Sequence, residues 1–219
     1  MGADTEHEKD VVGRSAAQLI EDGMTVGLGT GSTALRFLRA LADRELEIGC
    51  VATSPATEAA ALGLGLRVEP FGPRSRLTRL DIAVDGADQV TRDGWVVKGG
   101  GGAHTREKIV AAAAERFVVI VSSDKIVDEI GPPVPLELNA FGAASTVDRL
   151  GSARLRDADT TLDGGSVLAD WVGSVKDPAE LAALLASTPG VVEHGLFPPE
   201  LVTEILVARG DEVECLAMD

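Results

Sequence analysis

The sequence has no apolar run of about 18 residues, the length that a membrane-spanning helix requires. It has only two cysteines, Cys50 and Cys215, and both lie in apolar, strand-like contexts. We therefore expect buried free thiols rather than a disulfide, as in a protein of the reducing cytoplasm. Residues 1–10 carry four acidic side chains and no apolar stretch, which does not match a secretory signal.

Positive charge is also scarce, because 35 acidic and 20 basic side chains give a formal net charge of −15. Such a charge argues against nucleic acid or an anionic membrane as a partner. Only five basic residues are lysines, and Lys98, Lys108 and Lys125 fall in or beside the motifs described below. The surplus of acid fits either an acidic surface around a small cationic site or an adaptation to salt.

Residues 1–127 alternate apolar runs typical of buried strands with helical patterns. Hydrophobic residues make up 45% of the chain, which is enough for a packed core. We expect strands over residues 24–28, 50–53, 81–84, 95–97 and 117–121, and helices over 8–21, 32–43, 55–62 and 105–114. This alternation predicts an α/β fold with a mostly parallel sheet and helices on both of its faces.

The pattern changes after Val127, where Pro132, Pro133 and Pro135 interrupt the chain. Beyond them we expect helices over residues 140–150 and 179–187, and strands over 166–169 and 191–195. A smaller α+β unit fits this stretch. A last apolar strand, over residues 213–218, is expected to return to the main sheet.

The first motif, Gly27–Thr33, is a glycine-rich segment between an expected strand and an expected helix. Glycines allow backbone N–H groups to approach an anion closely, and a helix start adds unpaired N–H donors. The segment is not a dinucleotide motif, because Ser32 stands at the third glycine position, and no Gly-Lys-Ser/Thr of a Walker A loop follows. It is either a phosphate cradle or a tight turn with Ser32 or Thr33 as the helix cap.

The second motif, Asp85-Gly86-Ala87-Asp88, places two acids directly after the expected strand 81–84. Open α/β sheets bind ligands at the carboxyl ends of their strands, so these carboxylates can face a ligand. The alternative is a plain turn, in which Asp caps backbone N–H groups and Gly supplies the bend.

In the third motif, Gly99–Gly102 follow Lys98 at the end of the expected strand 95–97. Four glycines are costly to order, which suggests that the backbone passes close to a ligand. Lys98 can point into the same crevice. Glu107 lies in the first turns of the next helix, where an acid is also favoured by the helix dipole alone. His104 is a candidate base, but we expect a single histidine in a glycine loop to lie at the surface.

The fourth motif, Ser122–Lys125, follows the expected strand 117–121 and ends on one of the few lysines, although an ordinary surface lysine is the alternative. Because the carboxyl ends of parallel strands share one edge, all four motifs should converge on one crevice. No metal site is expected, because His/Cys ligand spacing is lacking. A serine triad is not expected either, because the sequence has no Gly-x-Ser-x-Gly elbow.

Together, Gly29–Thr33, Asp85–Asp88, Lys98–Gly101 and Thr105–Lys108 resemble, in order and spacing, the motifs of the type A ribose-5-phosphate isomerases. Val191–Phe197 resembles the C-terminal signature of that family. The resemblance covers nearly the whole chain.

The resemblance implies a Rossmann-like catalytic domain formed by residues 1–127 and 202–219. It also implies a small α+β (ferredoxin-like) domain, residues 128–201, that acts as a lid or in oligomerisation. The protein is then expected to be a cytoplasmic homodimer or homotetramer whose partner is a small-molecule sugar phosphate, without metal or cofactor.

The activity that the resemblance implies is the interconversion of ribose 5-phosphate and ribulose 5-phosphate through an enediolate, in the non-oxidative pentose phosphate pathway. Glu107 is then the general base and Asp85 its acid/base partner. Lys98 stabilises the enediolate oxyanion, and Asp88 orients the sugar hydroxyls. The implied substrate- and phosphate-binding residues are Thr30, Gly31, Ser32, Thr33, Gly86, Ala87, Gly99, Gly100, Gly101, Lys125 and Lys9.

Two other functions fit parts of the pattern. A catalytically silent sugar-phosphate effector-binding domain would keep the phosphate cradle and lose the chemistry, but Asp85, Lys98 and Glu107 are all present and favour an enzyme. A sugar-phosphate deaminase or lactonase of related fold would be expected to use a histidine base, for which His104 is the candidate in these loops.

Overall fold

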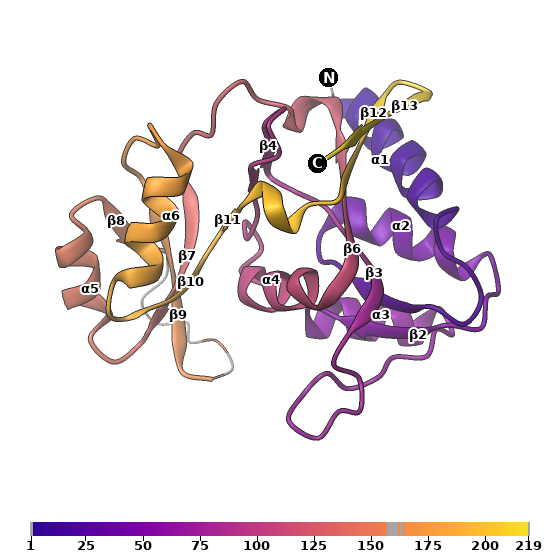
Figure 1. Cartoon of the computed structure of the whole chain (residues 1–219), viewed down its shortest axis with the longest axis horizontal. Coiled ribbons are helices and arrows are strands. Elements are labelled where there is room, and N and C mark those ends of the chain that lie inside the picture. Colours follow the sequence, from indigo (N-terminus) through magenta and orange to yellow (C-terminus); the bar gives the residue numbers. More distant parts are fainter. Residues whose placement is uncertain (1, 157–161, 163, 219) are drawn as a thin grey trace.

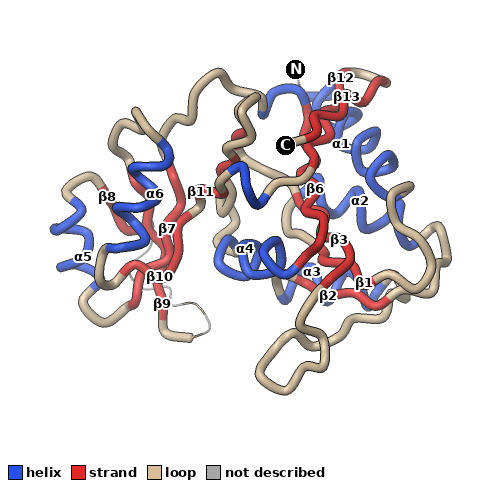
Figure 2. The backbone as a smooth tube through the Cα atoms, in the orientation of Figure 1, coloured by secondary structure: helices blue, strands red, loops and turns tan. Residues whose placement is uncertain are grey.

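The computed structural model describes residues 2–156, 162 and 164–218; residues 1, 157–161, 163 and 219 of the expected domain ranges lie outside it. Its largest sheet has six strands in the order β13-β12-β6-β3-β1-β2. All neighbouring pairs in it are parallel except β12 and β13, which form an antiparallel hairpin at one edge. The strands are β1 (Thr25–Leu28), β2 (Gly49–Ala52), β3 (Leu80–Asp85), β6 (Ala114–Ser122), β12 (Glu204–Arg209) and β13 (Glu212–Ala217). The predicted α/β fold with a mostly parallel sheet is confirmed. Figure 2 shows how helices and strands are distributed over the chain.

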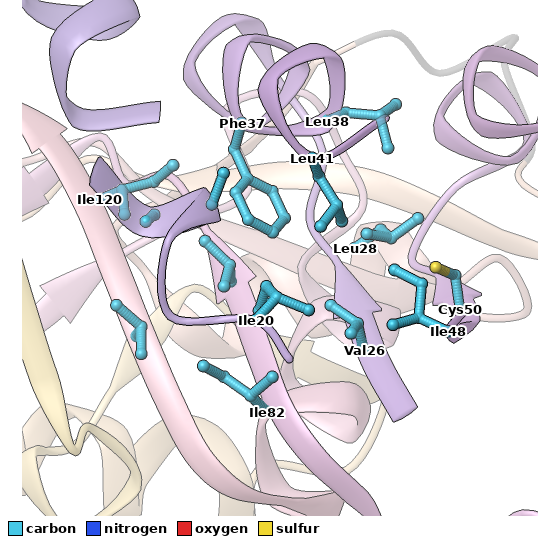
Figure 3. Packing of buried hydrophobic residues seen from close by; sticks show 14 of the residues in the cluster. Ile20, Val26, Leu28, Phe37, Leu38, Leu41, Ile48, Cys50, Ile82 and Ile120 are labelled. Atoms are coloured by element: carbon cyan, nitrogen blue, oxygen red, sulfur yellow. The ribbon is translucent and has the colours of Figure 1, made fainter. Parts of the chain in front are cut away.

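Helices cover both faces of this sheet, as the alternation of β6 shows. Val118 and Ile120 of β6 pack in one core with helices α1 and α2, whereas Val119 and Val121 pack in a second core with α4. Figure 3 shows the first core, with Phe37 of α2 lying between the helix and the strands. The four helices of this part are α1 (Gly2–Ala17), α2 (Ser32–Ala42), α3 (Pro55–Gly63) and α4 (His104–Ala113).

A second, antiparallel sheet lies apart from the first, at the left of Figure 1. Its strand order is β10-β7-β9-β8, and helices α5 and α6 share a separate hydrophobic core with it. This arrangement is the α+β unit that the sequence predicts after Val127. Its elements are β7 (Val134–Asn139), α5 (Ala143–Leu150), β8 (Ala153–Leu155), β9 (Ser166–Trp171), α6 (Pro178–Ser187) and β10 (Val191–His194).

A short antiparallel ribbon joins the two parts. Its strands, in the order β11-β5-β4, are β4 (Gln89–Val90), β5 (Val96–Val97) and β11 (Leu196–Phe197). Since side chains alternate along a strand, one face of the ribbon packs with the large sheet and the other with the small one. Val96 and Phe197 belong to the core that contains α4, and Val97 and Leu196 to the core of the small unit.

Two expectations about elements are wrong, and so is the expected burial of one cysteine. The strand over residues 95–97 is not part of the parallel sheet, because β5 pairs antiparallel with β4 and β11. Helix α1 runs from Gly2 to Ala17 and not over residues 8–21. It ends at Ala17 because the N–H groups that follow bond to carbonyl groups three residues back, which tightens the chain. Cys215 is exposed on the edge strand β13, whereas Cys50 is buried, and both are free thiols.

Of the helices in the described part of the chain, none has the length and apolar character needed to cross a membrane.

Candidate active site

Three neighbouring strands of the large sheet, β6, β3 and β1, end at the same edge and open onto one cavity of about 180 Å³. Every predicted site residue lines it except Asp85, which lies beneath it. The lining comprises Lys9, Thr30, Gly31, Ser32, Thr33, Gly86, Ala87, Asp88, Lys98, Gly99, Gly100, Gly101, Glu107 and Lys125. The expected convergence on one crevice is therefore seen, although the ribbon rather than the parallel sheet delivers Lys98.

Lys98 is at the centre of a buried group of charges. Its Nζ lies 2.9 Å from Oδ2 of Asp85 and 3.4 Å from Oε2 of Glu107, and it donates to the carbonyl oxygen of Gly86. The three ionisable side chains are at most 5% exposed. A carboxylate, a second carboxylate and an ammonium group thus share one site from which most water is excluded.

Asp85 is held by backbone N–H groups of the glycine-rich loop and of its own turn. Its Oδ1 accepts hydrogen bonds from the backbone N–H groups of Thr30 (3.1 Å) and Gly86 (2.7 Å). A Cβ on Gly29 would lie 2.1 Å from the carboxyl group, so only glycine allows the loop to pass this close. Asp85 therefore caps the turn and also contacts Lys98, whereas Asp88, the second acid of the motif, lines the cavity itself.

Burial decides the ionisation of the two acids. Burial, reinforced by the charges of Asp85 and Asp88, raises the pKa of Glu107 to about 8, and Lys98 only partly opposes it. Burial also raises the pKa of Asp85 despite its contact with Lys98. Burial alone would lower the pKa of Lys98, but the two neighbouring carboxylates raise it. The site therefore keeps its ammonium group charged and can hold one exchangeable proton on the acid pair near neutral pH.

The run of glycines lets the chain pass between two side chains. Gly99 has φ +101°, and a Cβ on it would lie 2.5 Å from Nδ1 of His104. The N–H of Gly100 donates to Oδ2 of Asp88 at 2.9 Å, which fixes that carboxylate at the cavity wall. Glycine is therefore needed at these positions because the loop packs closely around the cavity, although ordering glycine costs conformational entropy.

The other end of the cavity has the features of an anion site. Helix α2 starts at Ser32, and its N-cap, Gly31, makes no side-chain cap hydrogen bond. Capping by Ser32 or Thr33 is therefore wrong as an explanation of the loop, and the phosphate cradle is favoured. Lys9 and Lys125 line the same cavity, so two ammonium groups add to the positive end of the helix dipole.

The hydroxyl of Thr30 points away from this anion site. Its Oγ1 lies 2.8 Å from Oγ1 of Thr53 and 2.9 Å from Oγ of Ser54, beside the start of α3. The side chain of Thr30 therefore fixes the glycine-rich loop to the segment between β2 and α3.

His104 is fully buried, so the expectation of a surface position is wrong. It is the first residue of α4, it packs against Gly99, and it does not line the cavity. Burial lowers its pKa to about 4. A reaction that uses His104 as its base has no support from this geometry, which removes the basis of the deaminase or lactonase alternative.

Sequence reasoning missed Glu8, which supports the site from helix α1. Its carboxylate accepts from the N–H groups of Ser123 (2.8 Å) and Gly210 (3.0 Å) and so holds the short 3-10 helix that carries Lys125. No motif marks this residue, since an acid in an acidic helix carries no signal in the sequence. Within residues 2–156, 162 and 164–218, the site included, no three His, Cys, Asp or Glu side chains are grouped so that they could hold a metal ion.

The fold and this cavity are typical of an α/β enzyme with an acid–base site next to an anion site. Comparison with known proteins is consistent with that class. The family described as ribose 5-phosphate isomerase A (phosphoriboisomerase A) matches residues 49–212. The ribose-5-phosphate isomerase A of Gluconobacter oxydans is 42% identical over 97% of both chains, and that of Halobacterium salinarum is 41% identical over 90% of this chain and 89% of the other.

Solved structures agree. The ribose 5-phosphate isomerase A of Neisseria gonorrhoeae superposes with a TM-score of 0.91 at 26% identity over 98% of both chains. That of Methanocaldococcus jannaschii gives 0.87 at 33% identity over 95% of this chain and 97% of the other. The chain belongs to the ribose 5-phosphate isomerase A family, and its activity is the isomerisation of ribose 5-phosphate.

Proposed function

We propose that the cavity interconverts D-ribose 5-phosphate and D-ribulose 5-phosphate through an enediolate, with Glu107 as the general base. The observation that supports this most is the contact of Lys98 with both Glu107 (3.4 Å) and Asp85 (2.9 Å) inside a cavity that ends in an anion site. Removing a proton from a carbon next to a carbonyl group requires a base and a positive charge close to the developing oxyanion.

Glu107 takes the proton from carbon 2 of the open-chain aldose while the carbonyl electrons move to the oxygen on carbon 1, where Lys98 stabilises the negative charge. Glu107 then returns the proton to carbon 1, and the carbonyl group forms at carbon 2. Asp85 assists ring opening and moves the remaining proton between the two oxygens, while Asp88 orients the sugar hydroxyls.

The phosphate lies, in this proposal, at the start of α2. Ser32 and Thr33 supply hydroxyl and backbone donors there, and Lys9 and Lys125 supply charge. Both lysines contact an acid in the structure, Lys9 with Glu6 at 2.6 Å and Lys125 with Asp124 at 3.4 Å. A D-ribose-5-phosphate isomerase 30% identical to this chain has been solved in complex with phospho-erythronic acid, which supports a phosphorylated ligand in this cavity.

The family implies a role in the non-oxidative pentose phosphate pathway, and we propose a cytoplasmic homodimer or homotetramer that needs no metal or cofactor. We also propose that residues 1–127 and 202–219 form the catalytic domain and residues 128–201 a lid or oligomerisation domain. The separate hydrophobic cores of the two sheets support that division.

Substituting Glu107 by Gln tests the proposal. Since the amide cannot accept the proton, we expect turnover to fall by about 10²–10⁴-fold while ribose 5-phosphate still binds. Turnover is measured by coupled assay, and binding by calorimetry. Turnover equal to that of the unsubstituted protein would remove Glu107 from the mechanism, and loss of binding alone would assign it to ground-state recognition.

A further inference from the structure

The mechanism leaves unused the part of the C-terminal signature that runs from Glu193 to Phe197, called here the 193–197 segment. We propose that this segment positions Glu107 against Lys98, and that Lys108 is the residue through which it holds helix α4. The proposal rests on the proposed function of Glu107 and Lys98. Lys108 does not line the cavity, so it is a positioning residue rather than a catalytic one.

Lys108 fastens α4 to the segment. It directly follows Glu107 on the helix, and its Nζ donates to Oε1 of Glu193 and to the carbonyl oxygen of His194, both at 2.7 Å. The lysine side chain is 14% exposed, so its charge is largely removed from water and depends on these acceptors. A change at Lys108 therefore alters how α4 is held next to the residue that carries the base.

The same segment holds the backbone of Lys98. The N–H of Lys98 donates to the carbonyl oxygen of Gly195 at 2.9 Å, and Leu196 pairs with Val97 in the ribbon. A Cβ on Gly195 would lie 2.2 Å from the carbonyl oxygen of Lys98, so the two strands can meet only with glycine at this position. One segment thus contacts Lys98 directly and, through Lys108, the helix that carries Glu107.

Phe197 links the two ammonium groups. Its ring is fully buried, and its centroid lies 5.0 Å from Nζ of Lys108 and 5.8 Å from Nζ of Lys98. Both distances are within the range of cation–π attraction. The ring therefore fixes the ends of both lysines from one side, and with them the relative position of α4 and β5.

The charged groups around Glu107 and Lys108 provide a measurement that distinguishes a positioning role of Lys108 from a merely structural one. Glu107 faces Lys98, Asp85 and Asp88, while Lys108 faces Glu193, His194 and His104. Lys98 lowers the pKa of Glu107, so loosening their contact raises that pKa further. A displaced base should then show not only slower turnover but also an acid limb of kcat/KM that lies at higher pH.

The experiment compares Lys108→Met with Lys176→Met, the same change at an exposed lysine outside the cavity. Displacing a base by a fraction of an ångström costs much in rate, so we expect Lys108→Met to lower kcat roughly 10–100-fold and to change KM less than about threefold. Its acid limb should move to higher pH. Lys108→Arg, which keeps charge and donors, should recover part of kcat, and Lys176→Met should match the unsubstituted protein.

Either of two results would overturn the proposal. The first is a Lys108→Met protein with unchanged kcat. The second is a Lys108→Met protein whose loss of kcat equals its unfolded fraction and whose acid limb of kcat/KM has not moved. Should Lys108→Met not fold, Glu193→Gln removes the same ion pair and must show the same shift of the acid limb. These results also separate failure of the proposed function from failure of the positioning role. If the proposed function is wrong, Glu107→Gln stays active. If only the positioning role is wrong, Glu107→Gln is impaired and Lys108→Met is normal.

Discussion

Glu107 combines two conflicting needs. A base must be ionised to accept a proton, yet a carboxylate in a buried site next to Asp85 is disfavoured in that form. Lys98 reduces the conflict without removing it, and the resulting pKa of about 8 lies close to the pH at which the enzyme would work. The same burial that raises this pKa makes the carboxylate a stronger base than an exposed glutamate.

This pKa predicts the pH profile. Since the raised pKa of about 8 keeps Glu107 protonated at lower pH, kcat/KM should fall as the pH decreases through that value. The midpoint should lie clearly above the second ionisation of the substrate phosphate, which is about 6. Steady-state kinetics from acid to alkaline pH measures it. A profile that is flat down to the range of an ordinary glutamate would show that Glu107 is not the titrating base.

At the residue scale the sequence predicts most of the site and misplaces parts of it. Glu107, Lys98 and Asp85 are found because each lies in a motif at a strand or helix terminus. His104 is misplaced, since nothing in a glycine loop reveals that Gly99 leaves room for an imidazole beneath it. Glu8 carries no signal because its partners, such as Gly210, are distant in the chain.

At the scale of elements, the loop from β1 to α2 positions the site by close backbone packing. We predict that Gly29→Ala destabilises the protein by about 1–3 kcal/mol and lowers kcat, because the added Cβ would lie 2.1 Å from the buried Asp85 carboxyl. Urea denaturation and turnover measure the two effects. Gly72→Ala is the control, since a Cβ there meets nothing within 4 Å. Equal stability of both variants would contradict the close packing.

Elements with a clear period are predicted, and short or interrupted ones are not. Helix α2 and strand β3 agree with the sequence to within one or two residues. Strand β7 is missed because Pro135 near its start suggests a break, although at a strand end the missing N–H costs little. The ribbon strand β11 has only two residues, too few for any periodicity, so the true neighbours of Lys98 cannot be read from the sequence.

At the scale of the whole molecule, the acidic surplus and the small cationic site coexist. With a net charge of −15, repulsion between surface acids opposes compaction. We predict that Tm rises as NaCl increases from about 0.01 M to about 1 M, because the screening length falls from about 30 to about 3 Å. Calorimetry measures the Tm. Over the same range of salt, KM should rise because the attraction of Lys9 and Lys125 for the phosphate is screened. A Tm that falls with salt would show that the surface charges attract one another on balance.

In the proposed mechanism Glu107 carries a proton between two carbons of the sugar, next to the charge of Lys98. Incubation of ribose 5-phosphate with chelator-treated protein in heavy water tests it most directly, with deuterium at carbon 2 followed by NMR. We expect deuterium at carbon 2 with the unsubstituted protein and almost none with Glu107→Gln. Equal deuterium incorporation by the unsubstituted protein and by Glu107→Gln would contradict this role of Glu107.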